Sequence, residues 1–280
     1  MAAGFSAATK ETTKTPLKAN LKNWFLELPY KCILLYFIVF AKEVWLMKEK
    51  ILSQYPYRIE LHSHTNPGSG CSTLTPAELV RIYAEKGYHG VVITNHLEPD
   101  KLLFGKKEAI AIHIRDYEAA KIAAERYGIA VYLGVELRFK ENINDYLIYG
   151  VDERLLNVFY DYISTDVATF RKEVMLPDSV FLQAHPFRSN MVLCDPAFLD
   201  GMECLNMHPR HNSAVGLATQ YAYEKKLKIK IAGGDCHGMG DQGLAALRTK
   251  VLPKDSFEIA EILKSGDYVF EIGGGSLWIP

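Results

Sequence analysis

Two pairs of side chains near opposite ends of the chain have the types and the spacing of metal ligands. His62 and His64 stand one residue apart after a strand-like run, and Asp235 and His237 repeat this spacing near the C-terminus. Side chains two residues apart in an extended chain point to the same face, so each pair can bind one ion with both members. One His-x-His pair is weak evidence, whereas two such pairs predict a metal centre.

Alternating strand-like and helical segments are expected to position these residues. Helical patterns, including 76–86, 107–127 and 213–226, separate most of the apolar runs, and Thr75 before Pro76 is typical of a helix start. The predicted strands are 58–61, 90–94, 130–135, 146–150, 180–183, 201–205, 228–232 and 268–272. Repeated β-then-α order predicts an α/β protein with a parallel sheet, and seven or eight strands favour closure into a barrel.

Polar side chains fall at or near the ends of these predicted strands. Because ligands gather at the carboxyl ends of strands in α/β sheets and barrels, we expect these side chains to converge. They are His62, His64, His96, Glu136, Asp145, His185, Glu203, Asp235 and His237. Imidazole nitrogens and carboxylate oxygens suit zinc, manganese or iron, and a carboxylate can bridge two ions. Such a centre favours hydrolysis of phosphate esters.

The order of the motifs resembles that of the PHP (polymerase and histidinol phosphatase) superfamily. The resemblance covers roughly residues 57–280. Its motifs are His62-x-His64, Thr94-Asn95-His96, Gly134-Val135-Glu136, Ala184-His185-Pro186 and Gly234-Asp235-Cys236-His237. It implies a distorted (β/α)7 TIM-like barrel that carries two or three divalent ions (Mn, Zn or Fe) and hydrolyses phosphate mono- or diesters.

The resemblance also implies a division of the ligands among the ions. The first ion would be held by His62, His64, Glu136 and Asp235. Glu136 would bridge to a second ion held by His185, while His96 and His237 would serve a third. The residues expected to carry catalysis are His62, His64, Glu136, His185, Asp235 and His237.

Three positions depart from the pattern of the family. Asn95 stands where relatives usually have an aspartate, so an amide replaces a supporting carboxylate. No carboxylate lies between His64 and Thr75, which puts the third ion in doubt. Asp145 stands where relatives often have a histidine, and both a ligand role and a structural role are open for it.

Four further residues are candidates for contact with substrate. Arg188 and Arg210 have the planar, bidentate side chain that suits phosphate. His208 follows the sixth predicted strand and is either a phosphate or acid contact or a loop residue bonded to backbone. Glu203 either orients a metal-binding histidine or binds substrate. The remaining histidines are interpreted as surface or capping residues without a role: His89, His113 and His211.

Composition limits the partners and the compartment. The chain has 280 residues, 49% of them hydrophobic, with a net charge of −1 and a pI near 6.8. It therefore has no overall basic field for nucleic acid, and only a short oligonucleotide remains as a nucleic-acid substrate. Five cysteines without CxxC spacing argue against a disulfide framework, so we expect a cytoplasmic protein. No protein partner is implied. Cys236, between two ligands, is expected to face the core.

The first fifty residues differ from the rest. We expect residues 1–50 to form an extension, with a flexible tail over 1–20 and an apolar helix around 32–47, before a metallophosphoesterase barrel over 51–280. The apolar run is about half the ~20 residues that a membrane span needs. We interpret it as an amphipathic or buried helix that packs on the domain, or an interfacial one. Membrane contact is not favoured.

These observations predict a metal-dependent phosphoesterase that acts on a small phosphorylated substrate, either a phosphatase or a small-nucleotide phosphodiesterase. One alternative is an amidohydrolase-like enzyme that cleaves C–N bonds. Such enzymes commonly use a carboxylated lysine to bridge metals, and no lysine stands at a predicted strand end. Another alternative is a PHP-like protein that binds metal without turnover, which Asn95 and the absent carboxylate would explain.

Overall fold

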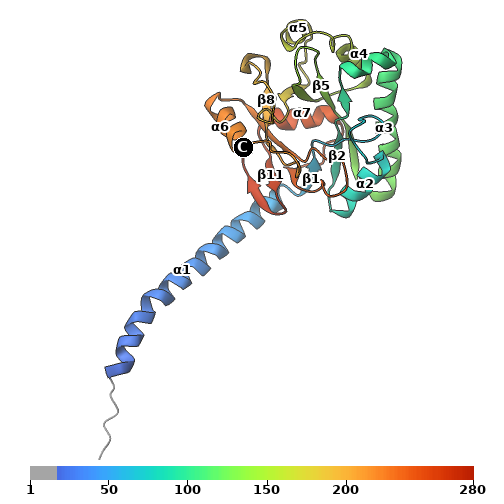
Figure 1. Ribbon diagram of the computed structural model, residues 1–280. Coiled ribbons are helices and arrows are strands. Elements are labelled where there is room, and N and C mark those ends of the chain that lie inside the picture. Colours follow the sequence, from blue (N-terminus) through green and yellow to red (C-terminus); the bar gives the residue numbers. More distant parts are fainter. Residues whose placement is uncertain (1–17) are drawn as a thin grey trace, which may run out of the picture. The chain divides into compact units, whose positions relative to one another are not determined.

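The chain divides into two units at Ile51 and Leu52, and a computed structural model describes residues 18–280, with side chains from residue 35 onward (Figure 1). In the first unit, the expected helix is present as α1 (Lys18–Gln54). It begins inside the tail expected over 1–20, and the rest of that tail lies outside the described residues. Large apolar side chains at 35–40 are exposed, and six consecutive residues cover every side of a helix, so this stretch has no polar face, and its packing on the domain stays a prediction.

No helix between residues 18 and 280 combines the length and the apolar character needed to cross a bilayer.

The second unit contains two six-stranded sheets. One has the strand order β12-β11-β10-β1-β2-β4, and the other has the order β3-β5-β6-β7-β8-β9. The strands of the first sheet are β1 (Tyr57–Glu60), β2 (Gly90–Ile93), β4 (Ala130–Leu133), β10 (Ala245–Thr249), β11 (Val269–Ile272) and β12 (Ser276–Trp278). Those of the second are β3 (His96–Leu97), β5 (Val135–Arg138), β6 (Asp145–Tyr149), β7 (Val180–Gln183), β8 (Gly201–Asn206) and β9 (Ile229–Gly233).

Strand directions in these sheets are mixed. Strands β1, β2 and β4 are parallel, as are β7, β8 and β9, but β6 is antiparallel to both β5 and β7. The α/β class is confirmed, whereas the expectation of a parallel sheet is wrong at β6 and at β10–β12. Residues 139–144 connect β5 to β6 without a helix, and so short a connection reverses the chain. Strand β6 therefore begins at the edge where its neighbours end.

The two sheets share segments of chain. Only Thr94 and Asn95 separate β2 from β3, and only Gly134 separates β4 from β5. On the other side, Ser63 and Cys236, just beyond β1 and β9, form a parallel bridge between the sheets. The sheets are thus linked by shared chain segments at one place and by this bridge at another.

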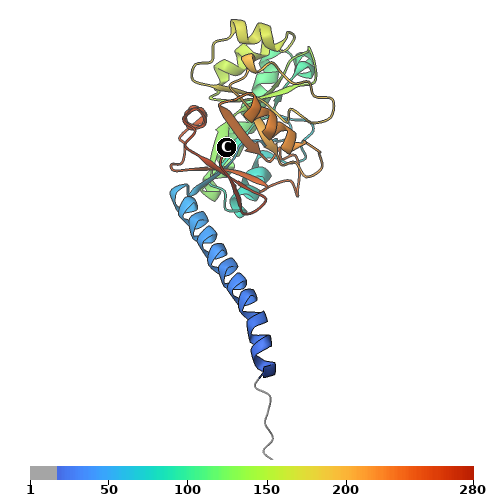
Figure 2. The same cartoon turned by 90° about the vertical axis from the view of Figure 1, so that its left-hand side faces the viewer.

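Helices surround these sheets (Figures 1 and 2). They are α2 (Pro76–Glu85), α3 (Lys106–Tyr127), α4 (Glu153–Tyr160), α5 (Val167–Glu173), α6 (Val215–Glu224) and α7 (Ser256–Ser265). Thr75 is the N-cap of α2, as predicted, and it forms a capping box with Glu78. Helices α4, α5 and α7 also lie between predicted strands, but the sequence predicts no particular range for them.

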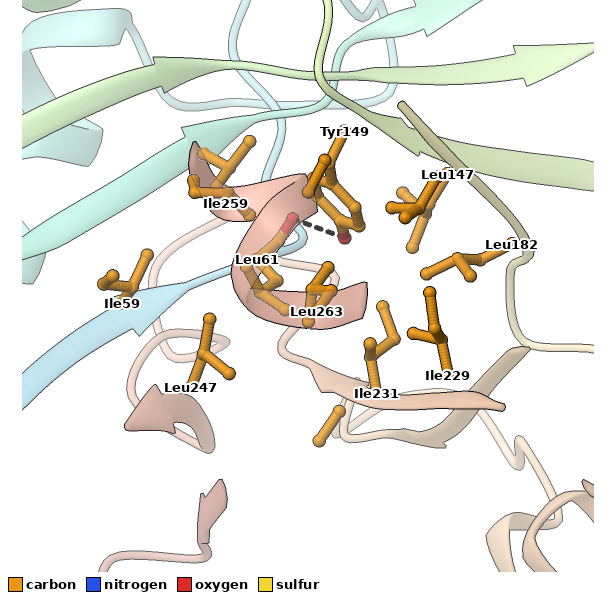
Figure 3. Close-up of a cluster of buried hydrophobic side chains, with 14 of the residues drawn as sticks. Ile59, Leu61, Leu147, Tyr149, Leu182, Ile229, Ile231, Leu247, Ile259 and Leu263 are labelled. Atoms are coloured by element: carbon orange, nitrogen blue, oxygen red, sulfur yellow. Dashed lines mark hydrogen bonds between the residues drawn. The ribbon is translucent and has the colours of Figure 1, made fainter. Parts of the chain in front are cut away.

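One of the two large apolar clusters joins residues of both sheets and of α7 (Figure 3). Ile59 and Leu61 from the β1 segment pack in it with Tyr149 of β6, and the Tyr149 hydroxyl donates a hydrogen bond to the Leu61 carbonyl at 3.0 Å. The backbone immediately before His62 is therefore anchored in the core.

Candidate metal centre

The two motif pairs of the sequence lie side by side. His64 N donates to the Cys236 carbonyl at 2.9 Å, and Cys236 N donates to the His62 carbonyl at 3.1 Å. The alternation of an extended chain then places His62 and Asp235 on the same side of this bridge. Cys236 is fully buried in an apolar cluster under α2 and α3, as predicted.

Close packing explains the two glycines before Asp235. A Cβ atom on Gly233 would lie 2.5 Å from Glu203 Oε1 and 2.6 Å from His62 Cβ. A Cβ atom on Gly234 would lie 2.6 Å from Glu60 Oε2. All three distances are shorter than real Cβ contacts, so only glycine lets this segment approach the residues behind the site.

Two of the expected ligands have left-handed backbone conformations. Asp235 has a φ of 51° and His185 a φ of 27°, each at the second residue after its strand, β9 and β7 respectively. Such conformations are uncommon for residues other than glycine and collect at functional sites, because the surrounding structure must hold them in place. Here they turn an imidazole and a carboxylate toward the group at the ends of the strands.

Four buried ligand atoms form a compact group, namely His62 Nε2, His64 Nε2, Glu136 Oε2 and Asp235 Oδ1. The distances from each histidine nitrogen to each carboxylate oxygen are between 3.2 and 3.4 Å. None of the four atoms has a hydrogen-bond partner. Ligands about 2.0–2.2 Å from a tetrahedral ion lie about 3.3–3.6 Å apart, so the group fits a zinc-like ion.

Electrostatics favour the same conclusion. Burial opposes ionisation of Glu136 and Asp235, yet the surrounding histidines, His62 foremost, hold the pKa of both carboxyls well below their ordinary values. Burial would also lower the pKa of His62, but Asp235, Glu203 and Glu136 raise it well above 6.5. Ionised carboxylates that remain short of partners in a buried site are suited to a cation.

Glu203 lies behind His62 rather than in front of it. Its Oε1 accepts from His62 Nδ1 at 2.9 Å, and its Oε2 accepts from His185 N at 2.9 Å. This carboxylate fixes the His62 tautomer that presents Nε2. Glu203 is fully buried and does not line the cavity described below, so the expectation that it binds substrate is corrected in favour of its alternative role of orienting a histidine.

Sequence reasoning missed Glu60 in the same region. Its carboxylate accepts from His62 N at 3.0 Å, from Gly234 N at 2.7 Å and from the Tyr83 hydroxyl at 3.0 Å. Burial raises the pKa of Glu60 to about 7. The available signal was its position two residues before His62, which puts both on one face of an extended segment.

A second group surrounds the other oxygen of Glu136. His185 Nε2 lies 3.0 Å from Glu136 Oε1 and 3.8 Å from Asp145 Oδ2. Asp145 is at the start of the antiparallel β6, which explains how it reaches the site. Arg138 donates to both carboxylate oxygens of Asp145 at 2.7 Å. Burial and the charge of Glu136 raise the pKa of Asp145 to about 6. Asp145 also belongs to a group of ligand atoms with His96 and Glu136.

His64, His96 and His237 form a third group. His96 Nδ1 has no hydrogen-bond partner and lies 3.2 Å from Glu136 Oε2, while His237 Nδ1 bonds to the Asp235 carbonyl at 2.9 Å. Burial lowers the pKa of His96 well below 6.5 and that of His237 to about 4. Both therefore present neutral nitrogens, the form that binds metal.

A cavity of about 400 Å³ opens over these groups. Its walls include the three remaining candidates for substrate contact, Arg188, His208 and Arg210. Arg188 Nη2 donates to Asp235 Oδ2 at 2.5 Å, so it also holds that carboxylate in place. His208 Nδ1 accepts from Arg210 N at 3.1 Å, which leaves the proton of the neutral ring on Nε2.

The histidines without an expected role divide three ways. His89 is exposed, as expected. His113 is buried in α3, so its interpretation as a surface residue is wrong; its helix packs inward at this position. His211 is exposed but lines the cavity and packs against His208 with ring centroids 4.4 Å apart.

Comparisons with known proteins support the fold. No protein-family model and no curated protein sequence matches the chain. Among solved structures, a two-domain protein from Bacteroides vulgatus, described as containing a predicted PHP-like metal-dependent phosphoesterase, superposes with a TM-score of 0.56 and 16% identity. The match covers 78% of this chain and 65% of that one. The chain has a PHP-like fold.

A second similar structure is PsfC from Pseudomonas syringae, with a TM-score of 0.51 and 11% identity over 80% of this chain and 91% of that one. At such identities the likeness concerns the fold alone. The resemblance found in the sequence motifs is thus confirmed for the PHP-like fold.

Proposed function

We propose that this protein is a metal-dependent phosphoesterase that hydrolyses a small phosphorylated substrate. The observation that carries the proposal is the group of four buried, unpartnered ligand atoms from His62, His64, Glu136 and Asp235. The description of the Bacteroides vulgatus protein as PHP-like supports the choice of phosphate esters.

We infer that the two sheets together form the distorted seven-stranded barrel that the motifs imply. The segments β2–β3 and β4–β5 run through both sheets, and the Ser63–Cys236 bridge joins them on the other side. In such a barrel, the first and last motif pairs are neighbours. We propose two ions as the minimum, at His62 with His64 and at His185, and a third at His96 with His237.

Divalent ions at such sites supply positive charge for phosphoryl oxygens and lower the pKa of water. The side chains of this protein would bind and orient the phosphate. Arg188 and Arg210 stand at the cavity wall, where guanidinium groups can bind phosphate oxygens. His208 lines the same cavity, and burial lowers its pKa to about 4, so its ring is neutral there. A cavity of about 400 Å³ suits a small ester rather than a polymer.

The test is a panel of phosphate mono- and diesters, assayed with Mn²⁺, Zn²⁺ and Fe²⁺ in the wild type and in His62→Ala. We expect turnover that depends on metal and is lost in the variant. His89→Ala is the matched control, since His89 is exposed outside the cavity. Metal binding without turnover of any ester would contradict the proposal, and cleavage of amides instead would favour the C–N hydrolase.

A further inference from the structure

The turn of residues 65–70 is fastened to helix α3 by one carboxylate. Asp116 of α3 is buried, and its Oδ2 accepts from Thr65 Oγ1 at 2.7 Å and from Gly68 N at 2.9 Å. Gly68 has a second contact through its carbonyl, which accepts from Lys101 Nζ at 2.7 Å. Thr65 and Gly68 are thereby both bonded to the same carboxylate of α3.

Asn95 completes this network. Its Nδ2 donates to Asp116 Oδ2 at 3.2 Å and to Thr65 Oγ1 at 2.8 Å, and its Oδ1 accepts from Thr65 N at 2.8 Å. Contact is so close that a Cβ atom on Gly68 would lie 2.0 Å from Asn95 Nδ2. The amide therefore donates to the Asp116 carboxylate and accepts from Thr65 N at the same time. A carboxylate at position 95 could accept from Thr65 N but could not donate to Asp116.

Ser69 connects this turn to two expected ligands. Its buried hydroxyl lies 3.1 Å from His64 Nδ1 and accepts from His96 N at 2.9 Å. A partner on Nδ1 sets the rotation of the ring and directs Nε2 to the ion site. His64 Nε2 is one of the four unpartnered atoms of the first group.

We infer that Asp116 is a positioning residue of the metal centre, acting through the 65–70 turn and the Ser69 hydroxyl to orient His64 and His96. The carboxylate that the second motif lacks at Asn95 is supplied by α3. Asn95 is then the neutral hydrogen-bond partner of the Asp116 carboxylate, and its amide does not leave the metal centre without a supporting carboxylate. This inference rests on the proposed metal centre.

An exchange of charge between positions 95 and 116 tests the inference. Asn95→Asp sets a second carboxylate about 3.2 Å from Asp116 and should weaken metal affinity by about 10–100-fold. The double variant Asn95→Asp/Asp116→Asn should recover part of the loss, because Gly68 N–H alone stays without its acceptor. Affinity is measured for Zn²⁺ and Mn²⁺ by competition with a chelator. If the double variant bound metal no more tightly than Asn95→Asp alone, the inference would be overturned.

Ser69→Ala tests the same connection while leaving the bonds of Asp116 intact, so it decides the question even where an Asp116 variant does not fold. We expect about 10-fold weaker binding, with recovery in Ser69→Thr. Ser72→Ala is the control, since this buried hydroxyl donates only to the His64 and His237 carbonyls. Equal affinity in Ser69→Ala and wild type would overturn the inference. A wild-type chain that binds no ion would overturn the metal centre itself, and with it this inference.

Discussion

The histidines of the site fall into an inner and an outer set with opposite electrostatics. Among the inner histidines, His62, His64 and His185, buried carboxylates outweigh the effect of burial and raise the pKa above 6.5. Among the outer histidines, His96, His208 and His237, burial dominates and lowers the pKa.

The difference follows from the carboxylates near each ring. Glu136 and Asp235 raise the pKa of all three inner histidines, and Glu203 adds to this at His62, whereas His237 bonds to a backbone carbonyl and His208 accepts from a backbone amide. Carboxylate partners make an imidazole a stronger metal ligand and fix its orientation. We therefore expect the inner set to hold its ions tightly. The outer set should bind an ion more weakly or contact substrate.

Glu136→Gln should have the largest effect, because Glu136 connects the two sets. Its Oε2 faces His62, His64 and His96, and its Oε1 faces His185. Loss of its charge should reduce the bound ions per chain and lower turnover by about 1000-fold or more, about 4 kcal/mol. Elemental analysis of the purified protein measures the first effect. Glu118→Gln on the exposed face of α3 is the control, and an unchanged ion count would refute the connection.

Glu60→Gln should show how much the buried charge of Glu60, behind His62, lowers the free energy of unfolding. Because burial raises the pKa of Glu60 to about 7 from 4.5, the folded metal-free protein favours the protonated form. Stability should therefore fall as the pH rises from about 4.5 to about 7 and stay level above that. The shift corresponds to ~3 kcal/mol.

The measurement is the free energy of unfolding of the metal-free wild type and Glu60→Gln between pH 4.5 and 8. The amide retains an oxygen for His62 N and Gly234 N but carries no charge. The advantage of the variant should grow with pH over this window. Parallel curves for the two proteins would show that Glu60 does not titrate there.

Glu203→Gln should weaken metal binding at the inner set by about 10–100-fold, or ~1.4–2.7 kcal/mol. The amide can still accept from His62 Nδ1 but lacks the charge that strengthens the ligand. Chelator competition measures the affinity, and Glu224→Gln on α6 serves as an exposed control. If the outer set lost its ions first in this variant, the division into two sets would be wrong.

The sequence predicts the histidines and carboxylates of the site better than the structure that supports them. His62, His64, Asp235 and His237 stand just beyond strand ends with a spacing of two, from which local geometry predicts that the members of each pair share a face. The partners Glu203, Arg188 and Asp116 act across long distances in the chain, and no local pattern reports which ring or loop they contact.

The direction of β6 shows the same limit in the fold. Alternation of strands and helices predicts parallel neighbours, but the connection after β5 has no helix and reverses the chain. Hydrophobic periodicity reports that a segment is a strand without its direction. Asp145 lies beside Glu136 and His185, although a parallel arrangement would have put the start of its strand at the far edge.

Arg210→Lys should have the smallest effect, confined to the outer side of the cavity. Arg210 is 57% exposed and pairs with the buried Asp241, so lysine keeps a charge for that carboxylate but loses the planar fork. We expect a KM two- to five-fold higher, about 0.5–1 kcal/mol, with kcat and ion content unchanged. Steady-state kinetics on the best ester of the panel measures this, with Arg81→Lys as the exposed control. A fall in bound metal would instead place Arg210 among the groups that support the ligands, and the outer wall would then be part of the metal centre.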